Sequence, residues 1–189
     1  EVTLYIRPHA WSDPVPVTKT VDSMLVSKIS GVPLYAGLGD KSEGNKEAWA
    51  PLLEKRLALE KGSYNDISGG RISKKFNYSG AFELLTGKGQ STQMVSSLSD
   101  DEALLLIQDC LDNNKPVTCG TLSGKQGADL TQEANKLNVY WNHAYAPVSV
   151  DAGSKTLTLQ NPWGTNHVEK LSVQDFRRFY KTIRIGESI

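Results

Sequence analysis

The sequence has few cysteines, no excess of either charge and no long apolar run. Its 189 residues include two cysteines and no Cys-x-x-Cys pair, which excludes a disulfide-rich scaffold and a zinc site of that spacing. The 21 basic and 21 acidic residues cancel, so neither a nucleic-acid partner nor an anionic membrane is indicated. No apolar run reaches the length of about 18 residues that a transmembrane helix needs. We expect a soluble protein, either cytoplasmic or secreted.

Histidine is also scarce, and the histidines do not form a metal-binding pattern. His9, His143 and His167 lie far apart in the sequence, without a His-x-x-x-His spacing, so no histidine metal site is expected. The chain begins EVTLYIRPHAW, without Met and without a basic-then-apolar signal segment. This beginning favours a processed or excised piece of a longer protein.

The apolar pattern predicts a domain of the α+β class. Alternating runs bounded by turn residues predict strands, and a period of about 3.6 residues predicts helices. The expected helices are 47–62, 80–85, 100–112 and 172–179, and the expected strands are 2–6, 16–21, 116–122, 145–150, 156–160 and 181–185. Most of 62–91 and all of 123–138 are glycine-bearing and polar, which predicts loops. Because most helices come before a run of strands, we expect an antiparallel sheet with a few helices.

Two of these helices have clear end signals. In the first, Pro51 fits the first turn and Gly62 fits the position that ends a helix. Its expected buried face consists of Trp49, Leu52, Leu53 and Leu57. The second begins with the sequence SDDE at 99–102, which is a capping box. Its expected buried face consists of Ala103, Leu104, Ile107, Cys110 and Leu111.

His143 and Asn161 form a candidate catalytic pair. They lie at the outer ends of a predicted hairpin, NHAYAPVSVD and LTLQNPWG, whose turn is DAGSK. Because those ends of a hairpin lie side by side, the Asn161 oxygen could hold one ring N–H of His143 and aim the other nitrogen at a nucleophile. Trp163 is placed to cover the pair and exclude water. The alternative is that His143 is an ordinary surface or core residue and that Asn161 belongs only to a turn.

Several stretches, in order, resemble the calpain family of cysteine proteases, which are papain-like enzymes of clan CA. These stretches are EAWAPLLEKRLALEKGSYNDISGG, FELLTG, NHAYAPVSVD with LTLQNPWG, and LSVQDFRRFYKTIRI. The first stretch is similar to the family's Trp and Leu-Leu-Glu-Lys helix with its aromatic-Ser-Gly-Gly loop, and the second to its Phe-x-x-x-Thr-Gly stretch. The third resembles the family's Gly-His-Ala-Tyr and Asn-Pro-Trp-Gly motifs. The last resembles its closing Asp-Phe-x-x-x-Tyr helix and strand. Each motif alone is weak evidence, whereas the ordered set over about 45–185 is specific.

The resemblance implies the second, His- and Asn-bearing subdomain of a protease core, with a barrel-like antiparallel meander. Residues 1–44 would be the end of the first subdomain and its connecting strands, and residues 45–189 a single globular unit. His143 would be the general base of a cysteine endopeptidase, Asn161 would orient it and Trp163 would shield the pair. The further residues implied for shielding or substrate binding are Asn142, Ala144, Gly69 and Gly70.

The nucleophile that the family requires is missing from its expected place. In the family, the catalytic Cys and a preceding oxyanion-hole Gln lie upstream of the helix that begins near Trp49, and neither residue type occurs there in this sequence. Cys110 belongs to an apolar helix face, and Cys119 to a strand without a nearby charge to lower its pKa, so neither is expected to be the nucleophile.

Three explanations for the missing nucleophile remain open. The chain is one piece of a cleaved or autoprocessed protease whose partner is the Cys-bearing N-terminal subdomain, or it is that second subdomain alone, or it is an inactive protease fold that binds peptides or proteins. We favour the first two, because a pure binding module would have no use for the retained His, Asn and Trp. An unrelated α+β binding domain would make the whole set of motifs a coincidence.

The sequence departs from the family pattern at two points. Asn142 stands where calpains usually have Gly, which lets a peptide backbone approach closely, so substrate binding is expected to differ. The loop after Asn-Pro-Trp-Gly, TNHVEKLS, has Glu169 as its one acidic residue, whereas calcium prefers six to eight oxygens, several of them from carboxylates. No cofactor is therefore certain, and calcium is possible only through the family resemblance, since the acidic ligands of animal calpains are missing.

Overall fold

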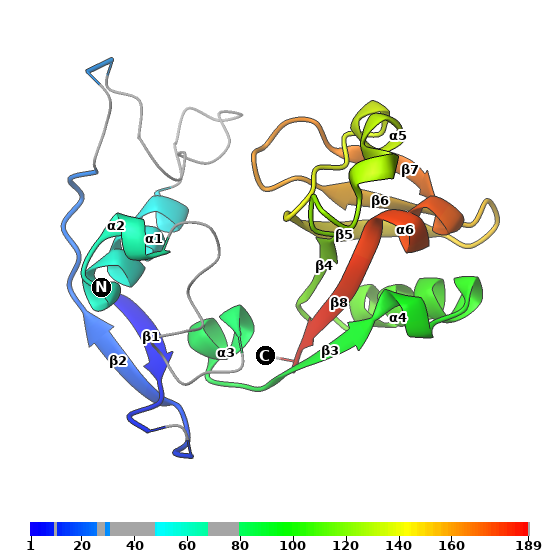
Figure 1. The fold of residues 1–189 in the computed structure, drawn as a ribbon. Helices are drawn as coiled ribbons and strands as arrows, with labels where there is room; N and C mark the ends of the chain where they lie inside the picture. Colours follow the sequence, from blue (N-terminus) through cyan, green and yellow to red (C-terminus); the bar gives the residue numbers. More distant parts are fainter. Residues whose placement is uncertain (10, 26–28, 31–47, 68–79, 189) are drawn as a thin grey trace. The chain divides into compact units, whose positions relative to one another are not determined.

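The structure is a computed structural model that describes residues 1–9, 11–25, 29–30, 48–67 and 80–188. Its contacts divide the chain into two compact units, Glu1–Lys88 and Gly89–Ile189 (Figure 1). Each unit is described by itself below. This division by contacts does not test the expected subdomain boundary between residues 44 and 45, which stays a prediction.

The first unit combines a hairpin with three helices. Strand β1 (Val2–Ile6) pairs antiparallel with β2 (Val15–Lys19), as the alternating runs predicted. The helices are α1 (Trp49–Lys61), α2 (Tyr64–Ile67) and α3 (Ala81–Thr86). A small core joins the hairpin to the helices, and its buried residues are Leu4, Leu57, Ala58, Ile67 and Leu84.

Helix α1 has the predicted ends, but its buried face is only partly the predicted one. Gly62 ends the helix at a φ of 110°, where its N–H donates to the Ala58 carbonyl. Leu57 is buried, whereas Trp49 is 65% exposed. Arg56 is fully buried instead, because its guanidinium donates to the Glu60 carboxylate at 2.5 Å. Thus an ion pair, which an apolar pattern does not register, occupies part of the inner face.

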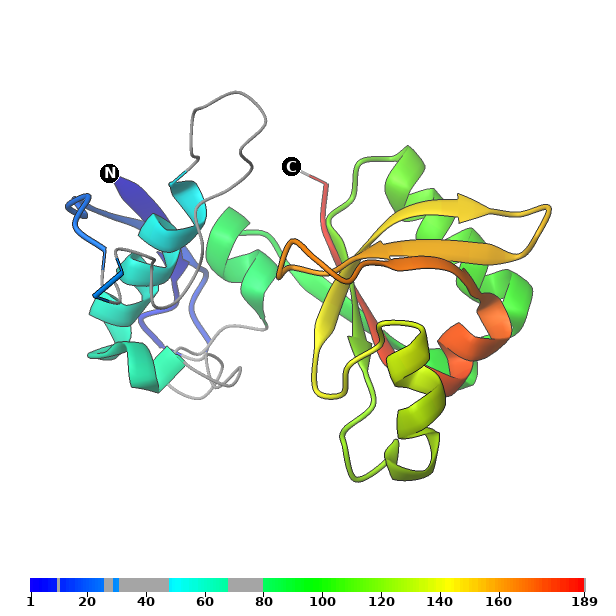
Figure 2. The same cartoon turned by 90° about the horizontal axis from the view of Figure 1, so that it is seen from above.

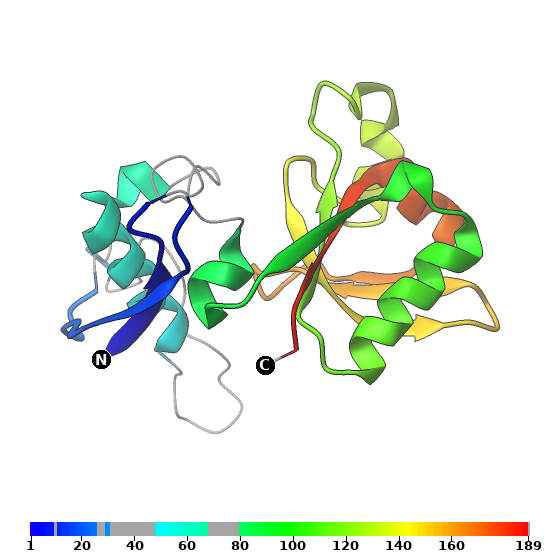
Figure 3. The ribbon, with the colours of Figure 1, turned by 90° about the horizontal axis from the view of Figure 1, so that it is seen from below.

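The second unit is a six-stranded antiparallel sheet with helices. Its strands follow the order β3-β8-β4-β5-β6-β7 across the sheet, and Figure 3 shows β3 alongside β8. The strands are β3 (Gln90–Met94), β4 (Val117–Thr121), β5 (Ala144–Asp151), β6 (Thr156–Gln160), β7 (Val168–Ser172) and β8 (Tyr180–Gly186). The helices are α4 (Asp100–Asp112), α5 (Thr131–Lys136) and α6 (Val173–Phe179), with short 3-10 turns at Val95–Ser97 and Ala128–Leu130.

The α+β class and the antiparallel sheet are confirmed, but the sheet is open. Strands β3 and β7 stand at its two edges, and within the described residues they do not pair with each other to close a barrel. The sequence did not reveal four elements, α2, β3, α5 and β7, and all of these except β3 lie wholly in expected loops. Strand β3, QSTQM, stands at the edge of the sheet and has no buried residue on either face, so no alternating apolar pattern marked it in the sequence.

Helix α4 is built as its local signals predicted. The Ser99 hydroxyl accepts the Glu102 N–H at 3.2 Å, and the Glu102 carboxylate accepts the Ser99 N–H at 2.7 Å, which completes the capping box. The apolar face packs into the core of the second unit, with Leu111 partly buried at its border; the buried members of that face are Ala103, Leu104, Ile107 and Cys110. In the part of the chain that the structure describes, no helix is long and apolar enough to cross a membrane.

Strands β5 and β6 form a hairpin (Figure 2), and the candidate catalytic pair flanks it, with His143 directly before β5 and Asn161 directly after β6. Ala146 lies opposite Gln160, so the register continued by one residue sets Asn161 opposite Tyr145. Tyr145 and His143 are alternate residues and therefore face the same side of the strand. The predicted hairpin thus brings Asn161 and His143 to the same side of one end of the sheet.

Candidate active site

His143 and Asn161 form a direct hydrogen bond at the open end of the hairpin. The His143 Nε2 atom lies 3.0 Å from Asn161 Oδ1. Asn161 is completely buried, whereas His143 is half-buried. A buried amide thus holds an imidazole that solvent still reaches, which is the arrangement expected for a group that must exchange protons.

The hydrogen bonds around the Asn161 amide fix the tautomer of His143. The Trp163 N–H donates to Asn161 Oδ1 at 3.1 Å, so this atom is the acceptor. The Asn161 NH₂ group points to the Asn166 carbonyl at 3.4 Å, which a flipped amide could not satisfy. Since Oδ1 accepts, His143 Nε2 must carry the proton that it donates. In the neutral ring Nδ1 then has a free lone pair and is able to act as a base.

Thr121, at the end of β4, holds the backbone of His143. Its hydroxyl accepts the His143 N–H at 3.0 Å and lies 2.8 Å from the Tyr140 carbonyl, to which it donates. Its own N–H donates to the His143 carbonyl at 2.9 Å. The side chain is only 8% exposed, so these bonds are largely shielded from water. Sequence reasoning missed this residue, which stands far upstream of His143.

The residues on either side of His143 are exposed. Asn142 adopts a φ of 54°, in the left-handed region that Gly and Asn accept more readily than other residues. The conformation gives a physical reason for Asn or Gly at this position that is independent of substrate approach. Ala144 begins β5 opposite Gly120. Gly69 and Gly70, the other two residues expected near the substrate, lie outside the described residues.

Two aromatic rings contact the His143 imidazole. The Trp163 ring centroid lies 4.5 Å away at an interplanar angle of 41°, and Tyr145 meets the imidazole edge-on at 4.9 Å. Trp163 also contacts Tyr140 at 4.9 Å, and it remains 59% exposed. Burial raises the pKa of Tyr145 to about 12, and its hydroxyl accepts the Tyr140 N–H at 2.9 Å and donates to the Asn138 carbonyl at 2.8 Å. Trp163 therefore lies against the His143 imidazole without enclosing it.

The loop after Asn161 folds back onto that residue. The Asn161 N–H donates to His167 Nδ1 at 3.1 Å, and the Gly164 N–H donates to the Asn161 carbonyl at 3.0 Å. Asn138 supports the far end of the loop, because its side-chain NH₂ donates to the His167 carbonyl at 3.1 Å. In the sequence, His167 was noted only as one of three histidines that lack a metal-binding spacing, and no role was predicted for it. The only signals that could have pointed to His167 were the small number of histidines in the sequence and its position shortly after Asn-Pro-Trp-Gly.

Both cysteines are free and buried. Cys110 is 1% exposed on α4, and Cys119 is completely buried on β4. Burial raises the pKa of both thiols, which lowers the fraction of reactive thiolate. Both cysteines therefore have the environment of structural core residues.

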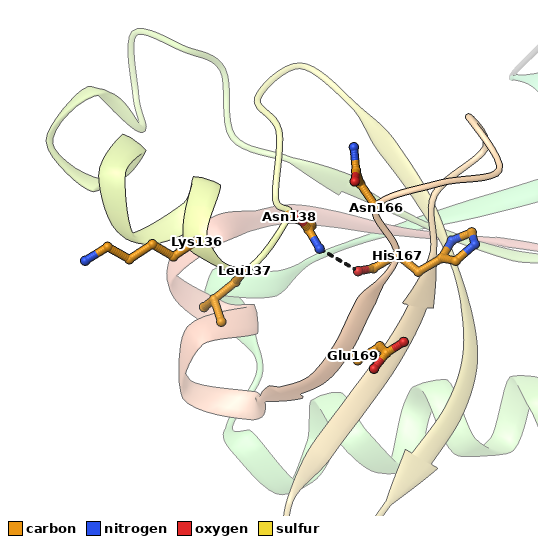
Figure 4. A pocket seen from close by; sticks show the side chains of 6 residues that line it. All are labelled: Lys136, Leu137, Asn138, Asn166, His167 and Glu169. Carbon is orange, nitrogen blue, oxygen red and sulfur yellow. Dashed lines mark hydrogen bonds between the residues drawn. The ribbon is translucent and has the colours of Figure 1, made fainter.

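Glu169 is the one acidic residue of the loop that follows Asn-Pro-Trp-Gly. This residue is exposed on β7, and the described residues include no group of three or more His, Cys, Asp or Glu side chains that could hold a metal. Glu169 also borders a cavity of about 430 Å³ (Figure 4). The residues that line this cavity are Lys136, Leu137, Asn138, Asn166, His167 and Glu169.

Comparison with known families adds an independent observation. The sequence model of a family described as calpain family cysteine protease matches residues 11–185. The match spans most of the chain and includes His143, Asn161 and Trp163. No individual curated protein matches the chain significantly.

Proposed function

Because the chain belongs to the calpain family of cysteine proteases, we propose that it supplies the general base and the orienting residue of a cysteine endopeptidase. His143 is the base and Asn161 orients it. The observation that carries the proposal is the 3.0 Å hydrogen bond from His143 Nε2 to a fully buried asparagine oxygen, which leaves His143 Nδ1 able to accept a proton. In this proposal the chain contributes the second, His- and Asn-bearing part of the protease core.

The proposed nucleophile is a cysteine thiol outside these 189 residues. Support comes from the burial of Cys110 and Cys119, the two cysteines of the sequence. The N-terminal protease subdomain, whether on the same precursor or on a separate chain, is the proposed source of that thiol. A thiol with an ordinary pKa of about 8.5 is mostly protonated at neutral pH, and a neighbouring imidazole that takes its proton makes it nucleophilic.

In the proposed reaction His143 transfers one proton in each step. His143 Nδ1 removes the thiol proton, and the sulfur attacks the peptide carbonyl carbon. When the carbon–nitrogen bond breaks, the imidazolium gives its proton to the leaving amine, and a thioester remains. A water molecule then loses a proton to His143, attacks the thioester carbon and releases the acid, while the sulfur recovers a proton from the imidazolium.

Asn161 and Trp163 act on the base in this scheme. The neutral Asn161 amide accepts a hydrogen bond from Nε2 in both protonation states, so it keeps the ring orientation throughout the cycle. The Trp163 ring covers part of the imidazole and reduces the access of water to it. Asn142 and Ala144, which are exposed beside His143, are proposed to lie next to the bound peptide.

The second candidate function is a protease fold that binds peptides without cleaving them. The burial of both cysteine side chains fits this alternative equally well, because the chain alone presents no exposed thiol. The two functions differ in what happens when the thiol is supplied. Only the endopeptidase requires the proton-accepting nitrogen of His143.

Peptide hydrolysis by the protein encoded in the complete reading frame tests the proposal. Hydrolysis is expected, together with its loss on treatment with a thiol-alkylating reagent and a fall of at least about a hundredfold in kcat for His143→Ala. His9→Ala is the matched control, since His9 lies in the first unit and is exposed. A folded protein that binds the peptide but does not cleave it, and for which His143→Ala changes nothing, would favour the binding function.

A further inference from the structure

We propose that His167 is a positioning residue that fixes Asn161 and, through it, the catalytic imidazole of His143. This inference rests on the proposed function for its catalytic meaning. Its structural part, the chain of hydrogen bonds from His167 to Asn161 to His143, stands on the geometry of this chain alone.

The loop 161–167 folds back so that several of its backbone groups form hydrogen bonds with Asn161. Asn161 Oδ1 accepts the Trp163 N–H, its carbonyl accepts the Gly164 N–H, and its NH₂ faces the Asn166 carbonyl. Gly164 and Asn166 have φ values of 75° and 54°, which let the loop turn back within a few residues. These contacts orient the side chain within the loop, but they leave the Asn161 N–H without a partner from the loop's backbone.

His167 provides that partner. Its Nδ1 atom accepts the Asn161 N–H at 3.1 Å. Because Asn161 is completely buried, a missing acceptor would leave a buried N–H unpaired, and the loop would have to shift to expose it. Any such shift would move Oδ1, which lies at hydrogen-bond distance from His143 Nε2.

His167 is itself held in place from both directions along the chain. Its carbonyl accepts the Asn138 NH₂ at 3.1 Å, and the next residue, Val168, is buried and begins β7 opposite Leu159. Figure 4 shows Asn138 reaching the His167 carbonyl while the imidazole points away from Lys136. The ring is therefore anchored through its backbone, and its Nδ1 is free to serve Asn161.

The proposal requires a particular tautomer of His167. Nδ1 accepts a hydrogen bond, so it carries no proton, and the neutral ring must be protonated on Nε2. His143 is protonated on the same nitrogen for a different reason, because its Nε2 donates to Asn161. The two imidazoles thus hold one asparagine from its backbone and its side chain.

The first experiment uses the unsubstituted 189-residue chain. Long-range ¹H–¹⁵N spectra of its histidine rings report which nitrogen carries the proton. We expect His167 as the Nε2–H tautomer with a hydrogen-bonded Nδ1, and His143 as the Nε2–H tautomer. A proton on His167 Nδ1 would overturn the proposal without the need for any variant.

The second experiment compares two substitutions of His167. His167→Asn places an oxygen where Nδ1 stands, whereas His167→Leu removes the acceptor. In His167→Leu the amide exchange of Asn161 should rise about tenfold or more, as expected for the loss of one buried hydrogen bond, and the His143 ring should become a mixture of tautomers. His167→Asn should restore both signals, and His9→Leu should change neither.

Two outcomes contradict the positioning role. An unchanged His143 tautomer in His167→Leu would show that the imidazole does not depend on His167. Equal changes of the Asn161 amide exchange and of the His143 tautomer in His167→Leu and His167→Asn would mean that the hydrogen-bond acceptor of His167 has no role. In the protein of the complete reading frame, His167→Leu should lower kcat by about tenfold to a hundredfold with KM unchanged. If that protein lacks activity altogether, the proposed function fails while the ring spectra still decide the role of His167.

Discussion

Thr121→Val should loosen the backbone of His143 by removing one hydroxyl group. The two side chains have almost the same shape, and Thr121 is 8% exposed, so the substitution creates neither a cavity nor a clash. The lost oxygen accepts the His143 N–H at 3.0 Å and donates to the Tyr140 carbonyl at 2.8 Å. The backbone bond from the Thr121 N–H to the His143 carbonyl should remain.

The expected loss of stability follows from these contacts. One neutral hydrogen bond is worth about 1 kcal/mol, and an N–H that stays buried and unpaired costs about 1–3 kcal/mol. We therefore expect the free energy of opening around β4 and β5 to fall by about 2 kcal/mol. Amide hydrogen exchange is the suitable assay, because it reports opening in the second unit separately from the first.

Thr182→Val is the matched control for this substitution. Thr182 is 9% exposed on the neighbouring strand β8, and it takes no part in the hydrogen bonds around His143 that the structure describes. Exchange at His143 and Tyr145 should accelerate in Thr121→Val and not in Thr182→Val. Equal exchange rates in the two variants would refute the role assigned to the Thr121 hydroxyl.

Three further predictions concern the same unit. Ser99→Ala should lower the free energy of unfolding by about 1 kcal/mol in urea titrations, since it removes the cap of α4, whereas Ser99→Asp should retain most of it. Asn142→Gly should leave the melting temperature almost unchanged, whereas Asn142→Val should lower it, because a β-branched residue resists a φ of 54°; equal melting temperatures would contradict this. Cys110 and Cys119 should resist alkylation at pH 8 until the chain is unfolded, as followed by mass spectrometry, because burial raises the pKa of both thiols and so keeps them protonated; rapid labelling of the folded chain would contradict their burial.

Local signals explain which parts of the fold were predictable. The capping box at Ser99 and the turn between β5 and β6 act through neighbours in the sequence, so the sequence showed both. Strand β7 has its apolar residues at Val168 and Leu171, a spacing that does not alternate, and only pairing with β6 makes it a strand. The exposed Trp49 and the buried Arg56 likewise depend on contacts across the first unit.

In the candidate site, too, the contacts within one hairpin were predictable and the contacts that depend on the wider fold were not. The hydrogen bond between His143 and Asn161 was foreseeable because the two residues flank one hairpin, and the structure places them 3.0 Å apart. Thr121 was not foreseeable, because its contact with His143 depends on the pairing of β4 with β5. His167 was visible as a rare residue, but its role requires the fold of the loop that brings Nδ1 to the Asn161 N–H.

The most direct test of the proposed function measures how fast the proposed nucleophilic cysteine, which lies outside these 189 residues, reacts with iodoacetamide as pH is varied. In the protein of the complete reading frame, we expect this thiol to react rapidly well below its ordinary pKa of about 8.5, because His143 accepts its proton. His143→Ala should move the onset of reaction up to that ordinary value, and His9→Ala should leave it in place. A thiol whose pH profile is the same with and without His143 would contradict the assignment of His143 as the catalytic base.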